Sequence, residues 1–127
     1  MSKPIIVAVD DQPFICQMIE TILKQKYDVR TFTSGSDAVD YLTENKVDFV
    51  LLDYYMPIKT GYEVLMDVRA SMHNSKTPVV FITAETNERM KMKMVERGAN
   101  DYICKPINSQ DLINCIEKHL SPEPGPR

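Results

Sequence analysis

Short unbroken apolar runs alternate along this chain with segments in which apolar residues recur every three or four positions. Runs of four or five apolar residues without a polar face are typical of strands buried on both sides of a parallel sheet. A spacing of three or four is typical of helices with one buried face. The pattern predicts five strands, at residues 5–9, 29–32, 49–52, 79–82 and 102–104. The second is the most polar, which favours a place near a sheet edge.

Helices are predicted after each strand, and local signals indicate where they begin and end. Pro13 suits the first position of the first helix, where a missing N–H costs nothing, and Asp11 or Gln12 would cap it. The later helices are expected from Ser34 to about residue 45, from Gly61 to about residue 72, from a cap at Thr86 or Asn87 to Gly98, and from Ser109 to Leu120. Gly98 suits a left-handed C-cap.

Five strands alternating with five helices predict a single α/β domain built on a doubly wound parallel sheet. Ligands of such sheets bind at the carboxyl ends of the strands, where the strand order reverses. Polar residues follow four of the predicted strands at that edge: Asp10 and Asp11, Asp53, Thr83, and Lys105. A lone Asp53 would read as the start of a loop, but four complementary strand ends predict a functional site.

The chemistry of this set can be argued from the residue types. Three crowded carboxylates raise one another's pKa unless a cation shares them, and a hard divalent ion such as Mg²⁺ is the natural partner. A carboxylate is also a nucleophile towards phosphorus, so Asp53 could carry an aspartyl phosphate. The Lys105 ammonium and the Thr83 hydroxyl would neutralise the charge of the phosphoryl group.

Composition narrows the range of partners. With a net charge of −3 and a pI of about 5.3, the chain is not expected to bind nucleic acid or membranes through bulk charge. No apolar run is long enough to span a membrane, and the first residues do not resemble a signal peptide. Cys16, Cys104 and Cys115 are odd in number and lie in apolar segments, which indicates buried thiols in a reduced, cytoplasmic protein.

Several other features are expected to be structural. Met90 and Met94 would face the core while Met92 is exposed, and the basic residues Lys24, Lys26 and 89–93 would lie on solvated helix faces. His73 and His119 do not look like phosphocarriers or metal ligands. The Pro-rich tail at 121–127 is expected to be a disordered end or the start of a linker.

These motifs together resemble those of the CheY-like receiver domains of bacterial two-component response regulators. The resemblance runs from about Ile5 to Leu120 and keeps every motif in order: Asp10-Asp11, 53–57 with Gly61, Thr83-Ala84, and 101–106. It implies a flavodoxin-like (βα)5 fold with strand order 2-1-3-4-5, and a receiver domain over residues 1–120. It also implies a cis peptide bond between Lys105 and Pro106.

The resemblance implies a role for each motif residue. Asp53 would accept phosphate from a sensor histidine kinase or a histidine phosphotransfer protein. Asp10, Asp11, Asp53 and the backbone carbonyl of Tyr55 would hold Mg²⁺. The phosphoryl oxygens would be bound by Thr83, the Ala84 amide and Lys105.

Switching is implied as well. Tyr102 would turn inward as Thr83 moves towards the phosphate, changing the surface formed by the fourth helix, fifth strand and fifth helix. That surface would regulate a target protein or a C-terminal output domain, and a phosphorylation-dependent dimer is compatible with it. Tyr55 and Glu85 occupy the two positions that tune dephosphorylation in the family, and the bulk of Tyr55 predicts slow self-hydrolysis. The protein would be a regulator, not an enzyme with a separate substrate.

Three alternatives remain at this point. A Mg²⁺-dependent phosphohydrolase would also use an aspartyl phosphate, although the close Asp-x-Asp pair is absent around Asp53. A nucleotide-binding flavodoxin-like module is disfavoured because no Gly-rich loop follows the first strand. Within the family, the chain could be a receiver that belongs to a longer regulator.

Overall fold

The computed structural model describes residues 3–120 as one parallel five-stranded sheet with five helices. The sheet order is β2-β1-β3-β4-β5, so the predicted doubly wound class and strand order are confirmed. The predicted tail at 121–127 lies outside the described residues. The elements are β1 (Ile5–Val9), α1 (Pro13–Leu23), β2 (Asp28–Phe32), α2 (Gly35–Glu44), β3 (Phe49–Asp53), α3 (Gly61–Ala70), β4 (Val79–Thr83), α4 (Glu88–Glu96), β5 (Asp101–Cys104) and α5 (Ser109–His119).

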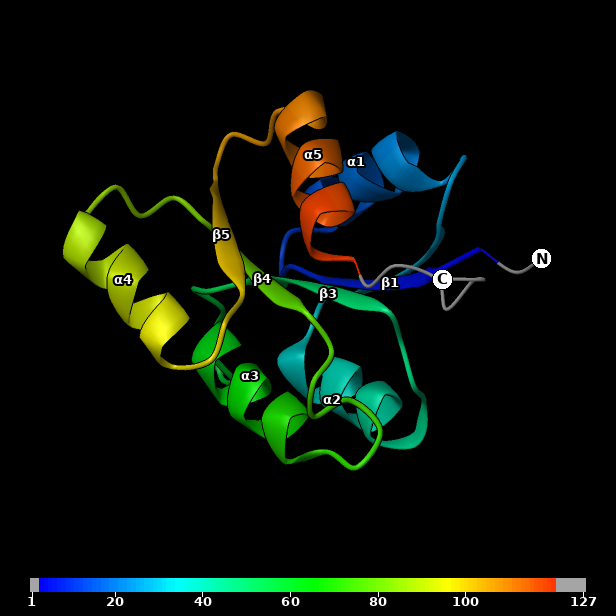
Figure 1. Ribbon diagram of the computed structural model, residues 1–127, viewed down its shortest axis with the longest axis horizontal. Coiled ribbons are helices and arrows are strands. Elements are labelled where there is room, and N and C mark those ends of the chain that lie inside the picture. The colour runs from blue at the N-terminus through cyan, green and yellow to red at the C-terminus, as the bar shows by residue number, and fades with distance from the viewer. Residues whose placement is uncertain (1–2, 121–127) are drawn as a thin grey trace, which may run out of the picture.

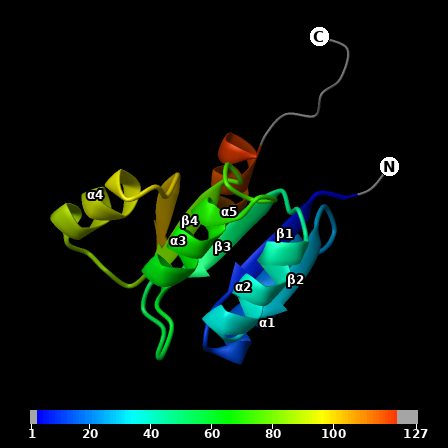
Figure 2. The same ribbon diagram turned by 90° about the horizontal axis from the view of Figure 1, so that it is seen from below.

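Helices cover both faces of the sheet (Figure 1). α1 and α5 pack on one face, and α2, α3 and α4 on the other, with α2 and α3 side by side (Figure 2). Each face has its own apolar core, and every residue of β3 and β4 is buried. Full burial on both faces is why these two strands appear in the sequence as unbroken apolar runs. β2 is an edge strand with exposed positions, as its polarity predicted.

The helix starts follow the predicted signals with three differences. Gln12 stands at the N-cap of α1, but the expected capping by a side chain is not found there. Pro13 occupies the first turn of α1, Ser34 accepts a hydrogen bond from the Asp37 amide at 3.1 Å, and Asn87 caps α4. α5 is capped by Asn108, because Ser109 is already helical. α3 is held by a reciprocal capping box between Thr60 and Glu63, which the sequence reading did not identify. The expected positive φ is found at Gly98, at 117°.

Lys91 departs from its prediction as a solvated residue, because only 9% of it is exposed. Its ammonium lies 5.1 Å from the centre of the Tyr102 ring and 3.5 Å from Glu88 Oε1. An aromatic face and a carboxylate together compensate a lysine for lost water. The expectations for the methionines are confirmed, since Met94 is buried, Met90 packs against the core and Met92 is 62% exposed.

The three cysteines are also less uniformly buried than predicted. Cys16 is buried and Cys115 is half-buried, but the prediction of a buried Cys104 is wrong. Side chains alternate along a strand, so Ile103 faces the core under α1 and α5 while Cys104 points the other way. β5 is an edge strand, and Cys104, its last residue, is exposed. No helix within residues 3–120 has the length and apolar character needed to cross a bilayer.

Candidate functional site

The polar residues singled out in the sequence meet at the carboxyl edge of the sheet. Asp10 follows β1, Asp53 ends β3, Thr83 ends β4, and Lys105 follows β5. Sheet hydrogen bonding continues to these positions: the Asp10 amide donates to Phe32 O at 3.1 Å and the Lys105 amide to Thr83 O at 2.8 Å. The backbone at the site is therefore as fixed as the sheet itself.

Three carboxylates form the centre of the site, and we call Asp10, Asp11 and Asp53 the acidic cluster. Their oxygens include a set that all lie within 4.8 Å of one another. Asp10 is fully buried and Asp53 is 3% exposed, whereas Asp11 is open to solvent. Such closeness is unfavourable without compensating positive charge.

Lys105 provides part of that compensation. Its Nζ lies 3.0 Å from Asp10 Oδ2 and 3.6 Å from Asp53 Oδ2. Burial opposes the charge on this ammonium, but the two carboxylates outweigh it and raise the pKa of Lys105 above its ordinary value. Lys105 therefore remains a cation, between the carboxylates at the ends of β1 and β3.

One ammonium does not satisfy the cluster. Burial first, and the negative charge of Asp10 second, raise the pKa of Asp53 from 3.8 to about 7 despite the opposing effect of Lys105. Asp10 Oδ1 accepts a hydrogen bond from the Gln12 amide at 2.9 Å, and the Lys105 ammonium lies 3.0 Å from Asp10 Oδ2. One ammonium among three carboxylates leaves net negative charge at the site, which is unfavourable without a further cation.

The donor set fits a hard divalent cation. All three ligands offer carboxylate oxygen, with no sulfur or imidazole nitrogen, which is the preference of Mg²⁺. A cation shared by these oxygens would offset their remaining negative charge and favour the ionised form of Asp53. The Tyr55 backbone, two residues beyond Asp53, lies at the same edge of the sheet.

Beside the acidic cluster, Thr83 ends β4 and Ala84 begins the loop that follows. Thr83 is fully buried, and its Oγ1 accepts a hydrogen bond from the Glu85 amide at 3.0 Å, so the hydroxyl proton remains free to donate. The Ala84 amide makes no hydrogen bond within residues 3–120. The peptide bond between Lys105 and Pro106 is cis, as predicted.

Tyr55 and Glu85 bridge the two loops that leave β3 and β4. The Tyr55 hydroxyl donates to Glu85 Oε2 at 2.9 Å, and the Asn87 amide donates to Glu85 Oε1 at 2.9 Å. The Asn87 amide chiefly, and then the Tyr55 hydroxyl, lower the pKa of Glu85. Sequence reasoning named both residues but not their hydrogen bond, since nothing in a pattern of residue types specifies a contact between two loops.

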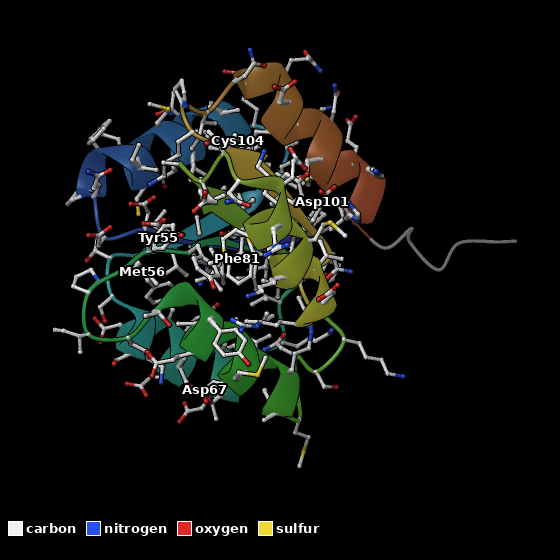
Figure 3. The ribbon with its side chains drawn as sticks, turned by 90° about the vertical axis from the view of Figure 1, so that its left-hand side faces the viewer. Tyr55, Met56, Asp67, Phe81, Asp101 and Cys104 are labelled. Carbon is white, nitrogen blue, oxygen red and sulfur yellow. The ribbon has the colours of Figure 1, made fainter. Side chains whose placement is uncertain are left out.

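Gly61 keeps the Asp53 loop closed. A Cβ at this position would come within 2.3 Å of the Asp53 carbonyl oxygen, and the Gly61 amide donates to Tyr54 O at 3.0 Å. The Tyr54 ring then packs edge-on against Phe81, which lies at the centre of Figure 3. The only signal for this close approach was the glycine itself.

Tyr102 is half-buried on β5 and packs against the core beneath α2, α3 and α4. It lies opposite Phe81 in the strand register, while Cys104 lies opposite Thr83. The Lys91 ammonium covers its ring. Tyr102 is therefore two residues along β5 from the position that faces Thr83, and it touches α4.

A doubly wound sheet with an acidic cluster, a lysine and a hydroxyl at its carboxyl edge defines the phosphoacceptor class of regulatory domains. Residues 6–117 match the family model of the response regulator receiver domain. The chain belongs to this family, whose members are regulatory phosphoacceptors that bind Mg²⁺ at the acidic site and interact with histidine kinases and output domains.

Solved structures agree with this assignment. The Vibrio cholerae chemotaxis protein CheY4 is 29% identical with a TM-score of 0.88, over 94% of this chain and all of that one. The receiver domain of a Pseudomonas aeruginosa sensor histidine kinase, with magnesium coordinated in its active-site cleft, is 25% identical with a TM-score of 0.84, covering 93% and 98%. The BeF3-activated receiver domain of Thermotoga maritima DrrB is 28% identical with a TM-score of 0.83, covering 92% and 97%.

Proposed function

We propose that this protein is a signalling switch that accepts a phosphoryl group on Asp53. The observation that carries the proposal is the convergence of the acidic cluster and Lys105 at the carboxyl edge of the sheet, where one ammonium faces three carboxylates. An acidic site of this kind is suited to a divalent cation and to a transferring phosphoryl group, since phosphoryl transfer asks a protein mainly for positioning and charge neutralisation.

The donor would be a phosphohistidine of a sensor histidine kinase or a histidine phosphotransfer protein. A carboxylate oxygen of Asp53 forms the new bond to phosphorus, the bond from phosphorus to the histidine nitrogen breaks, and the imidazole leaves with that electron pair. Lys105, 3.6 Å from Asp53 Oδ2, favours the ionised form of the acceptor and then pairs with the phosphoryl oxygens. The Thr83 hydroxyl and the Ala84 amide donate to those oxygens.

Asp10, Asp11, Asp53 and the carbonyl of Tyr55 are the groups that would hold Mg²⁺. When bound, this ion supplies positive charge that favours an ionised Asp53 and offsets the charge of the incoming phosphoryl group. The chain's own contribution is to fix the oxygen ligands: Asp10 by the Gln12 amide, and Asp53 by its place at the end of a buried strand.

The output of the switch would be the surface formed by α4, β5 and α5. Phosphorylation adds up to about two negative charges and three acceptor oxygens, which draw the Thr83 hydroxyl away from its present bond with the Glu85 amide. Tyr102 then enters the space that Thr83 leaves, and its contact with Lys91 on α4 changes with it. A target protein, an attached output domain or a second copy of this chain would read the altered surface.

Phosphorylation with acetyl phosphate and Mg²⁺, followed by intact mass spectrometry, tests the proposal. We expect one phosphoryl group per chain, sensitive to hydroxylamine as an acyl phosphate is, and none in Asp53→Asn. Asp40→Asn, an exposed carboxylate on α2, is the matched control and should be labelled like the wild type. A wild-type chain that stays unlabelled, or stoichiometric labelling of Asp53→Asn, would refute the proposal.

The phosphohydrolase alternative is not favoured, because the chain belongs to a family of phosphoacceptors. The two functions also differ in a measurable way. A phosphohydrolase would release phosphate from a small phosphate ester over many turnovers, whereas the proposed switch reacts once per chain and then hydrolyses slowly.

A further inference from the structure

A second group of metal-ligating side chains lies at the other end of β5, away from the acidic cluster. It consists of Asp101, the first residue of β5, and Cys115 and His119 on α5; we call it the Cys115 cluster. One ligand atom from each residue lies within 4.8 Å of the other two. Figure 3 shows Asp101 beside α5 and Cys104 towards the opposite end of β5. None of these residues takes part in the proposed phosphorylation.

The geometry of the Cys115 cluster comes from regular secondary structure. Cys115 and His119 are four residues apart on one helix, so both project from the same face. His119 Nε2 is 2.8 Å from Asp101 Oδ2, which joins the end of α5 to the start of β5. The His119 side chain is 18% exposed and that of Asp101 30%, so an ion from solvent can reach the cluster without unfolding it.

The donor atoms differ from those of the acidic cluster. A thiolate, an imidazole nitrogen and a carboxylate oxygen form a mixed set that suits Zn²⁺ and related transition metals, whereas Mg²⁺ prefers oxygen alone. Tetrahedral Zn²⁺ would hold its N and O ligands about 3.3 Å apart and its S ligand about 3.6 Å from either, from the usual bond lengths. Both spacings are within the 4.8 Å of the cluster, so binding asks only for small side-chain adjustments.

We propose that Asp101, Cys115 and His119 form a transition-metal site that takes Zn²⁺, with water as a fourth ligand. This proposal differs from the sequence-based interpretation of His119, which did not mark it as a metal ligand. On binding, the S–H bond of Cys115 and the N–H bond of His119 Nε2, which faces Asp101, break, both protons pass to water, and the sulfur, the ring nitrogen and the carboxylate oxygen bind the metal. Burial, followed by the charge of Asp101, raises the pKa of the Cys115 thiol to about 11, so the thiol is protonated until a metal arrives. The cation also sits at the C-terminal end of α5, where the helix dipole favours positive charge.

A metal here would tie β5 to α5. Both elements belong to the surface that we propose as the output of the switch, so occupancy would stiffen one side of that surface. The metal site stands on its own residues, however, and does not depend on phosphorylation of Asp53. Loss of metal binding can therefore be measured separately from loss of phosphorylation.

Titration of the full chain with Co²⁺ as a spectroscopic substitute for Zn²⁺ tests the site, in excess Mg²⁺ to occupy the acidic cluster. We expect a thiolate-to-cobalt charge-transfer band and tetrahedral ligand-field bands that saturate at one equivalent and disappear when Zn²⁺ is added. X-ray absorption of the zinc form should give one sulfur ligand at about 2.3 Å, with nitrogen and oxygen ligands at shorter distances.

Matched variants separate this site from adventitious binding. Cys115→Ser should abolish the charge-transfer band. His119→Gln should weaken Co²⁺ binding by at least about tenfold, because replacing even a residue that only supports a metal ligand weakens binding by that much. Cys104→Ser and His73→Ala alter an exposed thiol and an exposed histidine, and should leave binding unchanged. Absence of the band, its survival in Cys115→Ser, its loss in Cys104→Ser, or unchanged affinity in His119→Gln would each overturn the proposal. Circular dichroism of each variant shows that it is folded.

Discussion

Neutralising Asp53 should stabilise the metal-free protein, although it removes the proposed phosphoacceptor. In the folded chain, burial and the charge of Asp10 raise the pKa of Asp53 from 3.8 to about 7. Keeping this carboxylate ionised above pH 7 therefore costs up to about 4 kcal/mol relative to the unfolded chain. Asn has nearly the same shape and no charge, and Lys105 keeps its closer partner, Asp10, at 3.0 Å. We expect Asp53→Asn to be about 2–4 kcal/mol more stable above pH 7 in the absence of Mg²⁺.

The pH dependence of this difference has a definite sign. Because the folded-state pKa of Asp53 lies above its unfolded value, the folded wild type binds more protons than the unfolded chain between pH 3.8 and about 7. The free energy of unfolding of the wild type should therefore fall, relative to that of Asp53→Asn, as the pH rises through this window. Below this window Asp53 is protonated in both the folded and the unfolded wild type, so the difference in unfolding free energy between wild type and variant should vanish.

Urea unfolding followed by circular dichroism measures these differences, with EDTA present and at several pH values across the window. Asp40→Asn controls for the loss of a surface charge. Saturating Mg²⁺ should stabilise the wild type more than Asp53→Asn, because a ligand that binds only the folded state adds its binding free energy to stability, and so should narrow the gap. Equal stability of wild type and Asp53→Asn above pH 7 without metal would refute the argument that the acidic cluster is electrostatically strained.

Two further substitutions test Tyr55, in the loop after β3, and Asn74, a buried polar residue. Tyr55→Ala should shorten the half-life of the phosphorylated protein several-fold, and Tyr55→Phe, which loses only the hydrogen bond to Glu85, should have a smaller effect; an unchanged half-life in Tyr55→Ala would rule out shielding by this ring. Asn74→Ala should lower the free energy of unfolding in urea by about 3 kcal/mol. The fully buried Asn74 side chain accepts hydrogen bonds at Oδ1 from the Val47 amide and the Thr77 hydroxyl, and its removal leaves these buried donors unsatisfied. His73→Ala, an exposed neighbour, should cost little.

The sheet and the strand-end residues could be predicted because one physical cause governs both. Parallel strands buried on two faces must be apolar along their length, and they can carry polar side chains only where they emerge. Asp10, Asp53, Thr83 and Lys105 occupy those positions, so alternation and topology alone bring them to one edge. The roles assigned to them remain predictions until phosphorylation is measured.

Residues whose environment depends on packing between elements could not be predicted in this way. Lys91 looks solvated in a basic helix, yet α4 places it over Tyr102. Cys104 belongs to an apolar segment, yet it lies at the uncovered end of an edge strand. His119 has Cys115 four residues before it, but its other partner, Asp101, lies on another element and completes the group only in the fold. In each case the missing information is which side chain faces which across a helix–sheet interface.

The candidate site also has two parts, one at the strand ends and one in the loops. Asp10, Asp53 and Lys105 are held at strand ends by sheet hydrogen bonds, which leave little freedom for a phosphoryl group to be misplaced. Tyr55 and Glu85 sit on loops and are joined by one exposed hydrogen bond at 2.9 Å, which can open without disturbing the sheet. In the proposed function, the phosphoryl chemistry would therefore rest on the rigid part, and we expect the lifetime of the phosphorylated state to depend on the two loop residues. For that reason a change at Tyr55 should alter the decay of the signal while leaving the stoichiometry of phosphorylation at Asp53 intact.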